Sequence, residues 1–353
     1  MATATAPENT TEAATQQPQP LPLSCVLVTG GCGFIASNFL QYMVVKYPEI
    51  YFVNVDKVDY CSTVTGLEHL EGGGNYSFYP TNINNTAFME HIITKHRVST
   101  VMHFAAQSHV DNSFGNSLSF TQDNVLGTHF LLEVVRKCAP SALFIHVSTD
   151  EVYGEVGPHE TCTEASLLNP TNPYAASKAA AEFIVKSYHK SYGLPIIITR
   201  GNNVYGPGQY PEKLIPKFIS QLLSGQKMTV HGAGATMRNF VYVADVVKAF
   251  ELILFEGKVG AMYNIGSDNE HSVMDIARLL HSMLLGTAAA PLGASVTFVP
   301  DRLFNDSRYS VDSKELYALG WKNSTPFQDG LRQTIEWYKK TNMSDYFFNW
   351  SAF

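Results

Sequence analysis

Short apolar runs alternate with longer amphipathic segments along the first part of the chain, beginning at Leu23. The short runs are rich in β-branched and aromatic residues and are expected to form strands at Cys25–Thr29, Tyr51–Asp56, Tyr76–Tyr79, Thr100–Phe104, Leu143–Ser148 and Ile196–Thr199. The segments between them carry apolar residues at helical spacing and are expected to form helices at Ala36–Tyr47, Thr86–His96, Asn124–Lys137 and Ala175–Tyr192. Apolar strands separated by helices predict an α/β fold with a doubly wound parallel sheet.

The pattern differs at both ends of this alternation. After Arg200, Pro and Gly residues interrupt shorter elements, which indicates a smaller C-terminal lobe. Residues 1–21 are rich in Thr, Ala, Pro and Gln and contain no Lys or Arg, so they predict a disordered tail rather than a secretory signal or a transit peptide. We therefore expect a tail at 1–21, a sheet domain at 22–200 with a contribution from about 239–266, and a lobe formed mainly by 201–353.

Composition limits the classes of function that the chain fits. Of the 353 residues, 45% are hydrophobic and 16% are charged, which is enough apolar material for a large folded core. The net charge is −7 and Lys and Arg form no runs, so a nucleic-acid partner is not expected. A membrane-spanning protein is not expected either, because no apolar stretch reaches roughly 18–20 residues. The five Cys residues form no CxxC pair, which is typical of reduced thiols and of a cytoplasmic protein.

A glycine-rich turn lies between the first expected strand and the first expected helix. Gly30 and Gly33 would let the main chain approach a pyrophosphate, for which the helix N-terminus supplies free N–H groups and a positive dipole end. The second expected strand ends at Asp56, where a carboxylate accepts hydrogen bonds from ribose hydroxyls and repels a 2′-phosphate. These features predict a Rossmann-type domain that binds NAD rather than NADP, although Asp56 also fits a solvated strand end.

Tyr174 and Lys178 lie four residues apart and therefore on one face of an expected helix. A Lys ammonium stabilises a neighbouring phenolate. A hydroxyl at Thr149, after an expected strand, would help Tyr174 to take the proton of a substrate alcohol while hydride passes to NAD. By itself, the Tyr174 and Lys178 pair also fits an ordinary surface contact. Asp150 and Glu151 follow Thr149 and fit either a solvated loop or an acid and a base that face the substrate.

Several motifs together carry a family resemblance. They are Thr29–Ile35, Ser148–Gly154, the Tyr174 and Lys178 pair, Asn202–Pro207, Pro211–Pro216 and Asp301–Asp306. In these motifs the chain resembles the extended short-chain dehydrogenase/reductases and, within them, the nucleotide-sugar 4,6-dehydratases. The resemblance covers the chain from about Leu23 to Tyr338. It implies a hydro-lyase that keeps NAD bound and whose smaller lobe mainly binds a nucleotide sugar.

The Asp150 and Glu151 pair separates the dehydratases from their relatives. Sugar 4-epimerases usually carry small residues there, and nucleotide-sugar decarboxylases carry Ser-Glu. The resemblance implies oxidation at C4 of the sugar, loss of water across C5 and C6, and return of hydride to C6. In the corresponding roles, Tyr174 is the base for the C4 hydroxyl, Glu151 removes the C5 proton, and Asp150 protonates the departing C6 hydroxyl.

The resemblance also implies the remaining site residues. Those expected at the cofactor are Gly30, Gly33, Phe34, Ile35, Asp56, Lys57, Asn82, Ile83, Phe104, Ala105, Ala106, Tyr174 and Lys178. Those expected at the substrate are Ser108, Thr149, Asn203, Lys213, Leu214, Arg238, Arg302 and Asn305. Ala36 departs from the family pattern by replacing the third Gly of the turn, and Asn82 by replacing an Asp. The His residues show no ligand spacing, so no metal is expected.

The substrate's nucleotide is the least constrained prediction. His109–Phe114 and Asp301–Asp306 resemble UDP-glucose dehydratases of eukaryotes and giant viruses, including the N-terminal domain of plant rhamnose synthases. Bacterial thymidine-linked enzymes usually have Gly-His in place of Phe304 and Asn305. UDP-glucose is therefore favoured, in deoxysugar (rhamnose-type) biosynthesis, with dTDP-glucose as the alternative. A nucleotide-sugar epimerase or decarboxylase and a non-catalytic NAD-binding regulator are less favoured.

The quaternary structure is also predicted from the resemblance. Family members usually form homodimers through helices that correspond to Asn124–Lys137 and Pro173–Tyr192, which together make a four-helix contact. We therefore expect a homodimer.

Overall fold

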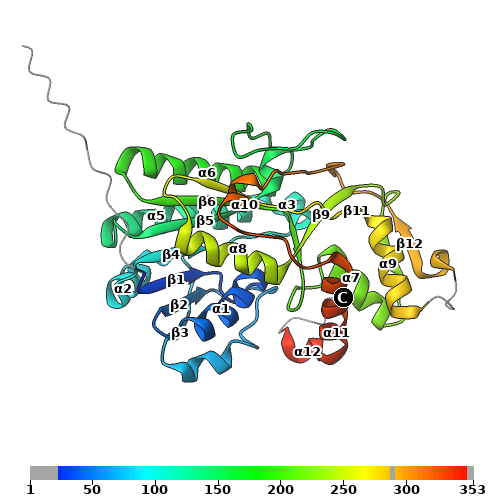
Figure 1. Ribbon diagram of the computed structural model, residues 1–353, viewed down its shortest axis with the longest axis horizontal. Helices are drawn as coiled ribbons and strands as arrows, with labels where there is room; N and C mark the ends of the chain where they lie inside the picture. Colours follow the sequence, from blue (N-terminus) through cyan, green and yellow to red (C-terminus); the bar gives the residue numbers. More distant parts are fainter. Residues whose placement is uncertain (1–22, 287–290, 348–353) are drawn as a thin grey trace, which may run out of the picture.

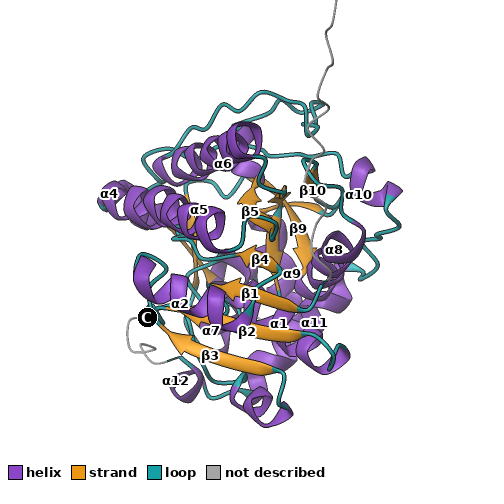
Figure 2. Cartoon of the chain, turned by 90° about the vertical axis from the view of Figure 1, so that its left-hand side faces the viewer, coloured by secondary structure: helices purple, strands orange, loops and turns teal. Residues whose placement is uncertain are grey.

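A seven-stranded parallel sheet organises the computed structural model, which describes residues 23–286 and 291–347. Its strands are β1 (Cys25–Thr29), β2 (Tyr51–Asp56), β3 (Tyr76–Pro80), β4 (Thr100–His103), β5 (Leu143–Thr149), β6 (Ile196–Gly201) and β10 (Met262–Ile265). They lie in the order β10-β6-β5-β4-β1-β2-β3, and Figure 1 and Figure 2 between them label all seven. Each strand expected from the sequence is present, with its ends shifted by at most two residues. The expected tail at 1–21 lies outside the described residues.

Alternation along β1 explains why helices cover both faces of the sheet. Leu27 lies in a core shared with α2 (Thr86–His96), α5 (Gly127–Cys138) and α6 (Pro173–Tyr192). Val28, one residue on, lies in a second core shared with α1 (Phe34–Lys46) and α8 (Val243–Glu256). Figure 2 shows α5 and α6 on one side of the sheet and α1 and α8 on the other. The predicted α/β fold class is confirmed.

Three helix starts differ from the sequence expectation for identifiable reasons. α6 begins at Pro173 rather than Ala175, because Asn172 acts as its N-cap residue. α1 begins at Phe34 rather than Ala36, because Gly33 already acts as its N-cap residue. The segment Thr121–Leu126 is a π-helix that precedes α5, so the helix expected from Asn124 begins as an irregular turn. Within this turn, the buried side-chain amide of Asn124 accepts a hydrogen bond from the main-chain N–H of Gln107 at 2.7 Å and donates one to the carbonyl of Gln107 at 3.0 Å. π-Helical turns of this kind occur mostly at functional sites.

The smaller lobe has a core of its own, which lies to the right in Figure 1. Its strands form a mixed sheet of β7 (Asn203–Tyr205), β9 (Met237–Tyr242) and β11 (Glu270–Ser272) and a parallel pair of β8 (Met228–His231) and β12 (Val296–Val299). Its main helices are α7 (Leu214–Leu223), α9 (Val273–Leu285) and α11 (Phe327–Lys340). Short helices complete the described chain: η1 (Glu68–Gly73), α3 (Val110–Gly115), α4 (Ser117–Phe120), η3 (Asp150–Tyr153), η4 (Leu292–Ser295), α10 (Lys314–Ala318) and α12 (Met343–Tyr346).

The order of the strands positions a cleft between the sheet and the smaller lobe. The strand order changes direction between β1 and β4, and ligands of open parallel sheets bind beyond the carboxyl ends of the strands at such a point. A cleft of about 450 Å³ lies there, lined by residues that follow β1, β2, β4 and β5 and by residues of the smaller lobe. Among the described helices, none is both long enough and apolar enough to cross a membrane.

Candidate active site

The glycine-rich turn brings the main chain of β1 against the segment that follows β4. Gly30 has a φ of +72°, and a Cβ atom there would lie 2.7 Å from the main-chain N and Cα of Ala105. A larger residue would therefore push these two segments apart. No side chain of the described residues caps the start of α1 at Gly33, so the N–H groups of its first turn are open to an anion. Ala36, which replaces the third glycine of the family turn, is buried in the core.

Asp56 holds the chain around the expected ribose position. Its carboxylate accepts the main-chain N–H of Cys32 at 2.9 Å and that of Val58 at 2.7 Å, one on each oxygen. Burial raises the pKa of Asp56, and these two hydrogen bonds oppose the rise. Each oxygen keeps a further lone pair, so the carboxylate is able to accept a ribose hydroxyl as well. Near the expected adenine, the side chain of Asn82 accepts the N–H of Asn84 at 2.9 Å instead of standing free.

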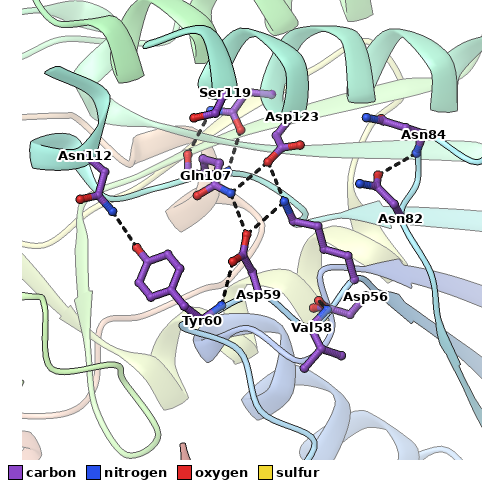
Figure 3. Close-up of polar contacts among 12 residues, drawn as sticks. Asp56, Val58, Asp59, Tyr60, Asn82, Asn84, Gln107, Asn112, Ser119 and Asp123 are labelled. Atoms are coloured by element: carbon purple, nitrogen blue, oxygen red, sulfur yellow. Dashed lines mark hydrogen bonds and ion pairs between the residues drawn. The ribbon is translucent and has the colours of Figure 1, made fainter. Parts of the chain in front are cut away.

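A polar network lies next to Asp56, and Figure 3 labels three of its members, Asp59, Gln107 and Asp123. The ammonium of Lys57 lies 2.8 Å from Asp123 and 3.0 Å from Asp59. The amide of Gln107 donates to the same two carboxylates, at 2.9 Å in each case. The network therefore ties the loop after β2 to the loop after β4 and to the π-helical segment. We name these four residues, Lys57, Asp59, Gln107 and Asp123, the cofactor-end network.

The catalytic candidates gather where β5 ends and α6 begins. Thr149 is the last residue of β5, and its hydroxyl donates to Asp150 at 3.2 Å and accepts the N–H of Glu151 at 3.3 Å. The amide of Asn202 donates to the other oxygen of Asp150 at 2.7 Å. The amide of Asn172 donates to Glu151 at 3.1 Å. Each carboxylate is thus held by an amide from a different part of the chain.

Burial dominates the electrostatics of the two adjacent carboxyl groups. Asp150 is 3% exposed, and burial together with the charge of Glu151 raises its pKa to about 7. Burial also raises the pKa of Glu151, which the guanidinium of Arg238 and the amide of Asn172 oppose. At neutral pH a large fraction of Asp150 therefore carries a proton, which is the state that a general acid needs.

Tyr174 and Lys178 lie one turn apart in α6 and are both buried. The helix starts with Asn172 as N-cap residue, whose side chain accepts the N–H of Ala175 at 2.8 Å, and Pro173 follows. Burial raises the pKa of Tyr174 above its usual value, and the charge of Glu151 adds to this rise. Burial lowers the pKa of Lys178 to about 8, and its ammonium donates to the carbonyl of Val147 at 2.7 Å.

Three cations border the opposite side of the cleft. Arg238 in β9 donates to the side chain of Asn305 at 3.2 Å. Arg302 pairs with Asp111 at 2.7 Å, and the ammonium of Lys213 donates to the carbonyl of Ser108 at 2.5 Å. All three cations are thus paired with groups of the protein itself. Guanidinium and ammonium groups of this kind suit a doubly charged diphosphate.

The structure brings nearly all the predicted site residues to this one cleft. The predicted residues that line it are Gly30, Gly33, Phe34, Ile35, Asp56, Lys57, Asn82, Ile83, Phe104, Ala105, Ala106, Ser108, Thr149, Glu151, Tyr174, Lys178, Asn203, Lys213, Leu214, Arg238, Arg302 and Asn305. In the described structure Asp150 does not line the cleft, and it is bonded to Thr149, which does. The described residues contain no group of three or more His, Cys, Asp or Glu that could hold a metal ion.

Sequence reasoning missed several residues that hold the site together. Asn172 and Asn202 hold the two carboxylates, and Asp59 and Asp123 complete the cofactor-end network. Asn172 carries a local signal, because an Asn before a Pro at the start of a helical pattern predicts an N-cap. The other three residues carry no such signal. Asn202 and Asp123 meet partners that are far away in the sequence, and Asp59, although only two residues after Lys57, joins the network through the distant Gln107.

The comparisons with known proteins agree with this site. The GDP-mannose 4,6 dehydratase family matches residues 27–334. A trifunctional UDP-glucose 4,6-dehydratase/UDP-4-keto-6-deoxy-D-glucose 3,5-epimerase/UDP-4-keto-L-rhamnose-reductase of Arabidopsis thaliana is 46% identical over 319 residues, which are 89% of this chain and 47% of the relative. The chain thus spans about half the length of this plant relative. A dTDP-D-glucose 4,6-dehydratase of Mus musculus is 45% identical over 326 residues, which are 92% of this chain and 90% of that protein.

Solved structures give the same result for the fold. The crystal structure of a dTDP-glucose 4,6-dehydratase from Streptomyces venezuelae, which holds NAD, has a TM-score of 0.86 and 35% sequence identity and covers 91% of this chain and 98% of its own. Sequence and fold thus identify the same group of proteins over most of the chain. The chain belongs to the nucleotide-sugar 4,6-dehydratases of the extended short-chain dehydrogenase/reductase family.

Proposed function

We propose that the chain is an NAD-dependent hydro-lyase that converts a nucleoside-diphosphate glucose, with UDP-glucose favoured, to the 4-keto-6-deoxy sugar in deoxysugar biosynthesis of the rhamnose type. The observation that carries this proposal is the pair of adjacent carboxyl groups, the buried Asp150 and the partly buried Glu151, held by Asn202 and Asn172 beside Tyr174. Oxidation at C4 needs only Tyr174 and its neighbours, whereas elimination of water needs an additional acid and base. The smaller lobe, mainly 201–353, binds the nucleotide sugar in this proposal.

The residues at the carboxyl ends of β1 and β2 fit NAD. The open N-terminus of α1 at Gly33 suits the pyrophosphate, and the glycine at position 30 lets the turn pack against the main chain of Ala105. Asp56 suits the adenosine ribose and disfavours a 2′-phosphate. When bound, NAD accepts hydride from C4 of the sugar and returns it to C6 in the same turnover.

The first chemical step is the loss of the C4 hydroxyl proton to Tyr174. Burial disfavours the phenolate of Tyr174, so the step needs positive charge nearby. Lys178, one helical turn away, supplies that charge, because a pKa of about 8 leaves its amine mostly protonated at neutral pH. Thr149 shares a hydrogen bond with Tyr174, which lowers the pKa of the phenol. These contacts support the role of Tyr174 as the base for C4.

The second step is elimination across C5 and C6. A ketone at C4 makes the neighbouring C5 proton acidic, so Glu151 removes this proton only after oxidation. The C6 hydroxyl leaves as water with a proton from Asp150, which lies behind the cleft-lining Thr149 and is bonded to its hydroxyl. Asp150 holds such a proton because its pKa is raised to about 7. A double bond forms between C5 and C6. Hydride then returns to C6, and a proton to C5, to give the 4-keto-6-deoxy sugar.

The preference for UDP-glucose rests on the segment that contains Phe304 and Asn305, both of which line the cleft. The plant relative named for UDP-glucose and the mouse relative named for dTDP-glucose are 46% and 45% identical to the chain, so dTDP-glucose is the second candidate. The test assays UDP-glucose and dTDP-glucose side by side and compares their kcat/KM values. A strong preference for dTDP-glucose would reverse the assignment of the nucleotide and leave the reaction unchanged.

Product analysis tests the reaction itself. In deuterated water, mass spectrometry and NMR of the product should show loss of water, a ketone at C4, deuterium at C5 and, at C6, the hydrogen that began at C4. An epimerised product that keeps its C6 hydroxyl would contradict the proposed function.

A homodimer is the second part of the proposal. Large apolar side chains stand exposed on the two neighbouring helices α5 and α6: Phe130 is 40% exposed, Phe183 is 59% exposed and Tyr192 is 59% exposed. A second copy of the same helix pair would bury these side chains in a self-complementary contact. Light scattering should give the mass of a dimer, and Phe183→Glu should shift it toward that of a monomer. A monomeric wild-type protein would contradict this part.

A further inference from the structure

A third carboxyl group, Asp306, borders the catalytic end of the cleft. It lies between β12 and α10, lines the same cleft as Glu151, and is only 2% exposed. One of its oxygens accepts two hydrogen bonds, from the hydroxyl of Thr171 at 2.6 Å and from the hydroxyl of Tyr309. The other oxygen has no partner among the described residues. Burying a carboxyl group in this way costs free energy of folding. The burial of Asp306 and its two hydroxyl partners therefore need an explanation.

The Thr171 hydrogen bond connects Asp306 to the start of α6. The next residue, Asn172, donates to Glu151 with its amide group and caps α6 with its carbonyl oxygen. This helix carries Tyr174 and Lys178. A hydrogen bond from Thr171 to a buried carboxylate thus fixes the segment that aligns Glu151, whereas α6 itself is also held by its packing on the sheet, where Val185 and Tyr188 lie in the core.

The Tyr309 hydrogen bond connects Asp306 to the cation that faces the catalytic pair. The guanidinium of Arg238 lies 4.6 Å from the centre of the Tyr309 ring, in the geometry of a cation–π contact. Arg238 also donates to the carbonyl of Met237 at 2.7 Å and to Asn305 at 3.2 Å. Asp306 fixes the ring by its hydroxyl, and the ring in turn supports the guanidinium.

We propose that Asp306 is a positioning residue for the elimination step, which holds Asn172 and Arg238 in place around Glu151 through the hydroxyls of Thr171 and Tyr309. The inference rests on the proposed function, because it assigns the C5 base to Glu151. Asp306 acts through its neighbours and takes no proton from the substrate. Its contacts converge on Glu151 from two sides, whereas Tyr174 reaches its own partner, Thr149, without them.

The test separates oxidation from elimination. Asp306→Ala removes the oxygen that accepts both hydroxyls. The variant should lower kcat about 10²-fold, the size expected when a catalytic group is misplaced by about an ångström. Oxidation should proceed, so the absorbance of reduced nicotinamide should appear with substrate and decay slowly. KM should change by less than about threefold. Asp306→Asn keeps an acceptor oxygen for both hydroxyls and should restore most of the activity.

Two further variants and one control distinguish a positioning effect from a simple folding defect. Thr171→Val and Tyr309→Phe each remove one hydroxyl and leave the carboxylate in place, and each should produce a milder form of the same delay. Asp312→Ala is the matched control, because Asp312 lies on the same segment and pairs with Lys314, which is largely exposed. The control should keep wild-type kinetics. Thermal unfolding of every variant shows whether the fold survives.

Three results would overturn the inference. They are a kcat of Asp306→Ala within threefold of wild type, an equal slowing of oxidation and elimination, and an Asp306→Asn variant as slow as Asp306→Ala in a folded protein. The third would mean that the charge, and not the hydrogen bonds, matters. Failure of the proposed function is a separate result, since it appears in the product that the wild-type protein makes.

Discussion

The two ends of the cleft use the same kinds of side chain in opposite ways. At the cofactor end, the side chains of Lys57, Asp59 and Asp123 are 37%, 34% and 21% exposed, and both carboxylates pair with Lys57. At the catalytic end, Asp150 and Lys178 are 3% and 4% exposed, and neither forms an ion pair within the described residues. Carboxylates and ammonium groups occur at both ends, so residue type does not separate them. The two ends differ instead in how far these side chains are exposed to water.

The pKa values of two aspartates show what this difference does. Burial alone would raise the pKa of Asp59, but the N–H of Tyr60 and the ammonium of Lys57 hold it below its usual value. At the other end, burial and the charge of Glu151 raise the pKa of Asp150 to about 7. A paired carboxylate at the wet end stays charged and serves as a structural tie. A carboxyl group at the dry end keeps its proton and is available as an acid.

The largest expected effect comes from removing the proposed base at the catalytic end. Tyr174→Phe deletes one hydroxyl but keeps the ring, so the variant should fold and should lose about 10²- to 10⁴-fold in kcat. Steady-state kinetics with UDP-glucose measure the loss, and thermal unfolding is the control for the fold. Activity within tenfold of wild type would remove Tyr174 from the chemistry.

Glu151→Gln should affect one step and leave the other. Oxidation at C4 continues, but the C5 proton stays in place, so the cofactor should remain reduced after substrate is added. Single-turnover absorbance detects this state, and deuterium should no longer enter C5. Asp150→Asn should give a weaker delay, because Asn keeps a donor. Full dehydration by both variants would make the pair structural.

The pH dependence should report the buried acid. In the proposed mechanism Asp150 donates a proton, so the elimination rate should fall as pH rises through about 7, by about tenfold per pH unit above that value. The free energy of unfolding should change in the same direction. In the folded protein the carboxyl group of Asp150 keeps its proton up to about pH 7, whereas in the unfolded chain it releases the proton near pH 3.8. The free energy of unfolding should therefore fall as pH rises between these two values. Asp150→Asn should flatten both profiles. Unchanged profiles in the variant would contradict the assignment.

The smallest effect is expected at the wet end. Exposed ion pairs contribute about 0.2–1 kcal/mol, so Lys57→Ala should speed the release of NAD by no more than about fivefold, and salt should mimic the change. Exchange of bound NAD against a labelled pool measures the rate at low and high ionic strength. Lys137→Ala, which removes a surface pair with Glu90 far from the cleft, is the control. A change in the rate of NAD release as large as the change in kcat of Tyr174→Phe would contradict the distinction between the two ends of the cleft.

The sequence by itself determined the parts that depend on local chain geometry. Strand and helix periods predict the sheet and its helices, because side chains alternate along a strand and repeat every turn of a helix. The glycine turn, Asp56 at a strand end and the spacing of Tyr174 and Lys178 are local in the same sense. The adjacent Asp150 and Glu151 are local too, and together with the neighbouring motifs they are enough to indicate the dehydratases.

Only the tertiary structure decided which distant residues meet and how dry each end of the cleft is. Lys57 and Asp123, or Asp306 and Thr171, are neighbours only because the sheet and the smaller lobe fold together. The raised pKa of Asp150 has the same origin, since desolvation depends on everything packed around a group. A sequence lists the charged side chains, but it does not state their distance from water, and that distance separates a structural tie from an acid.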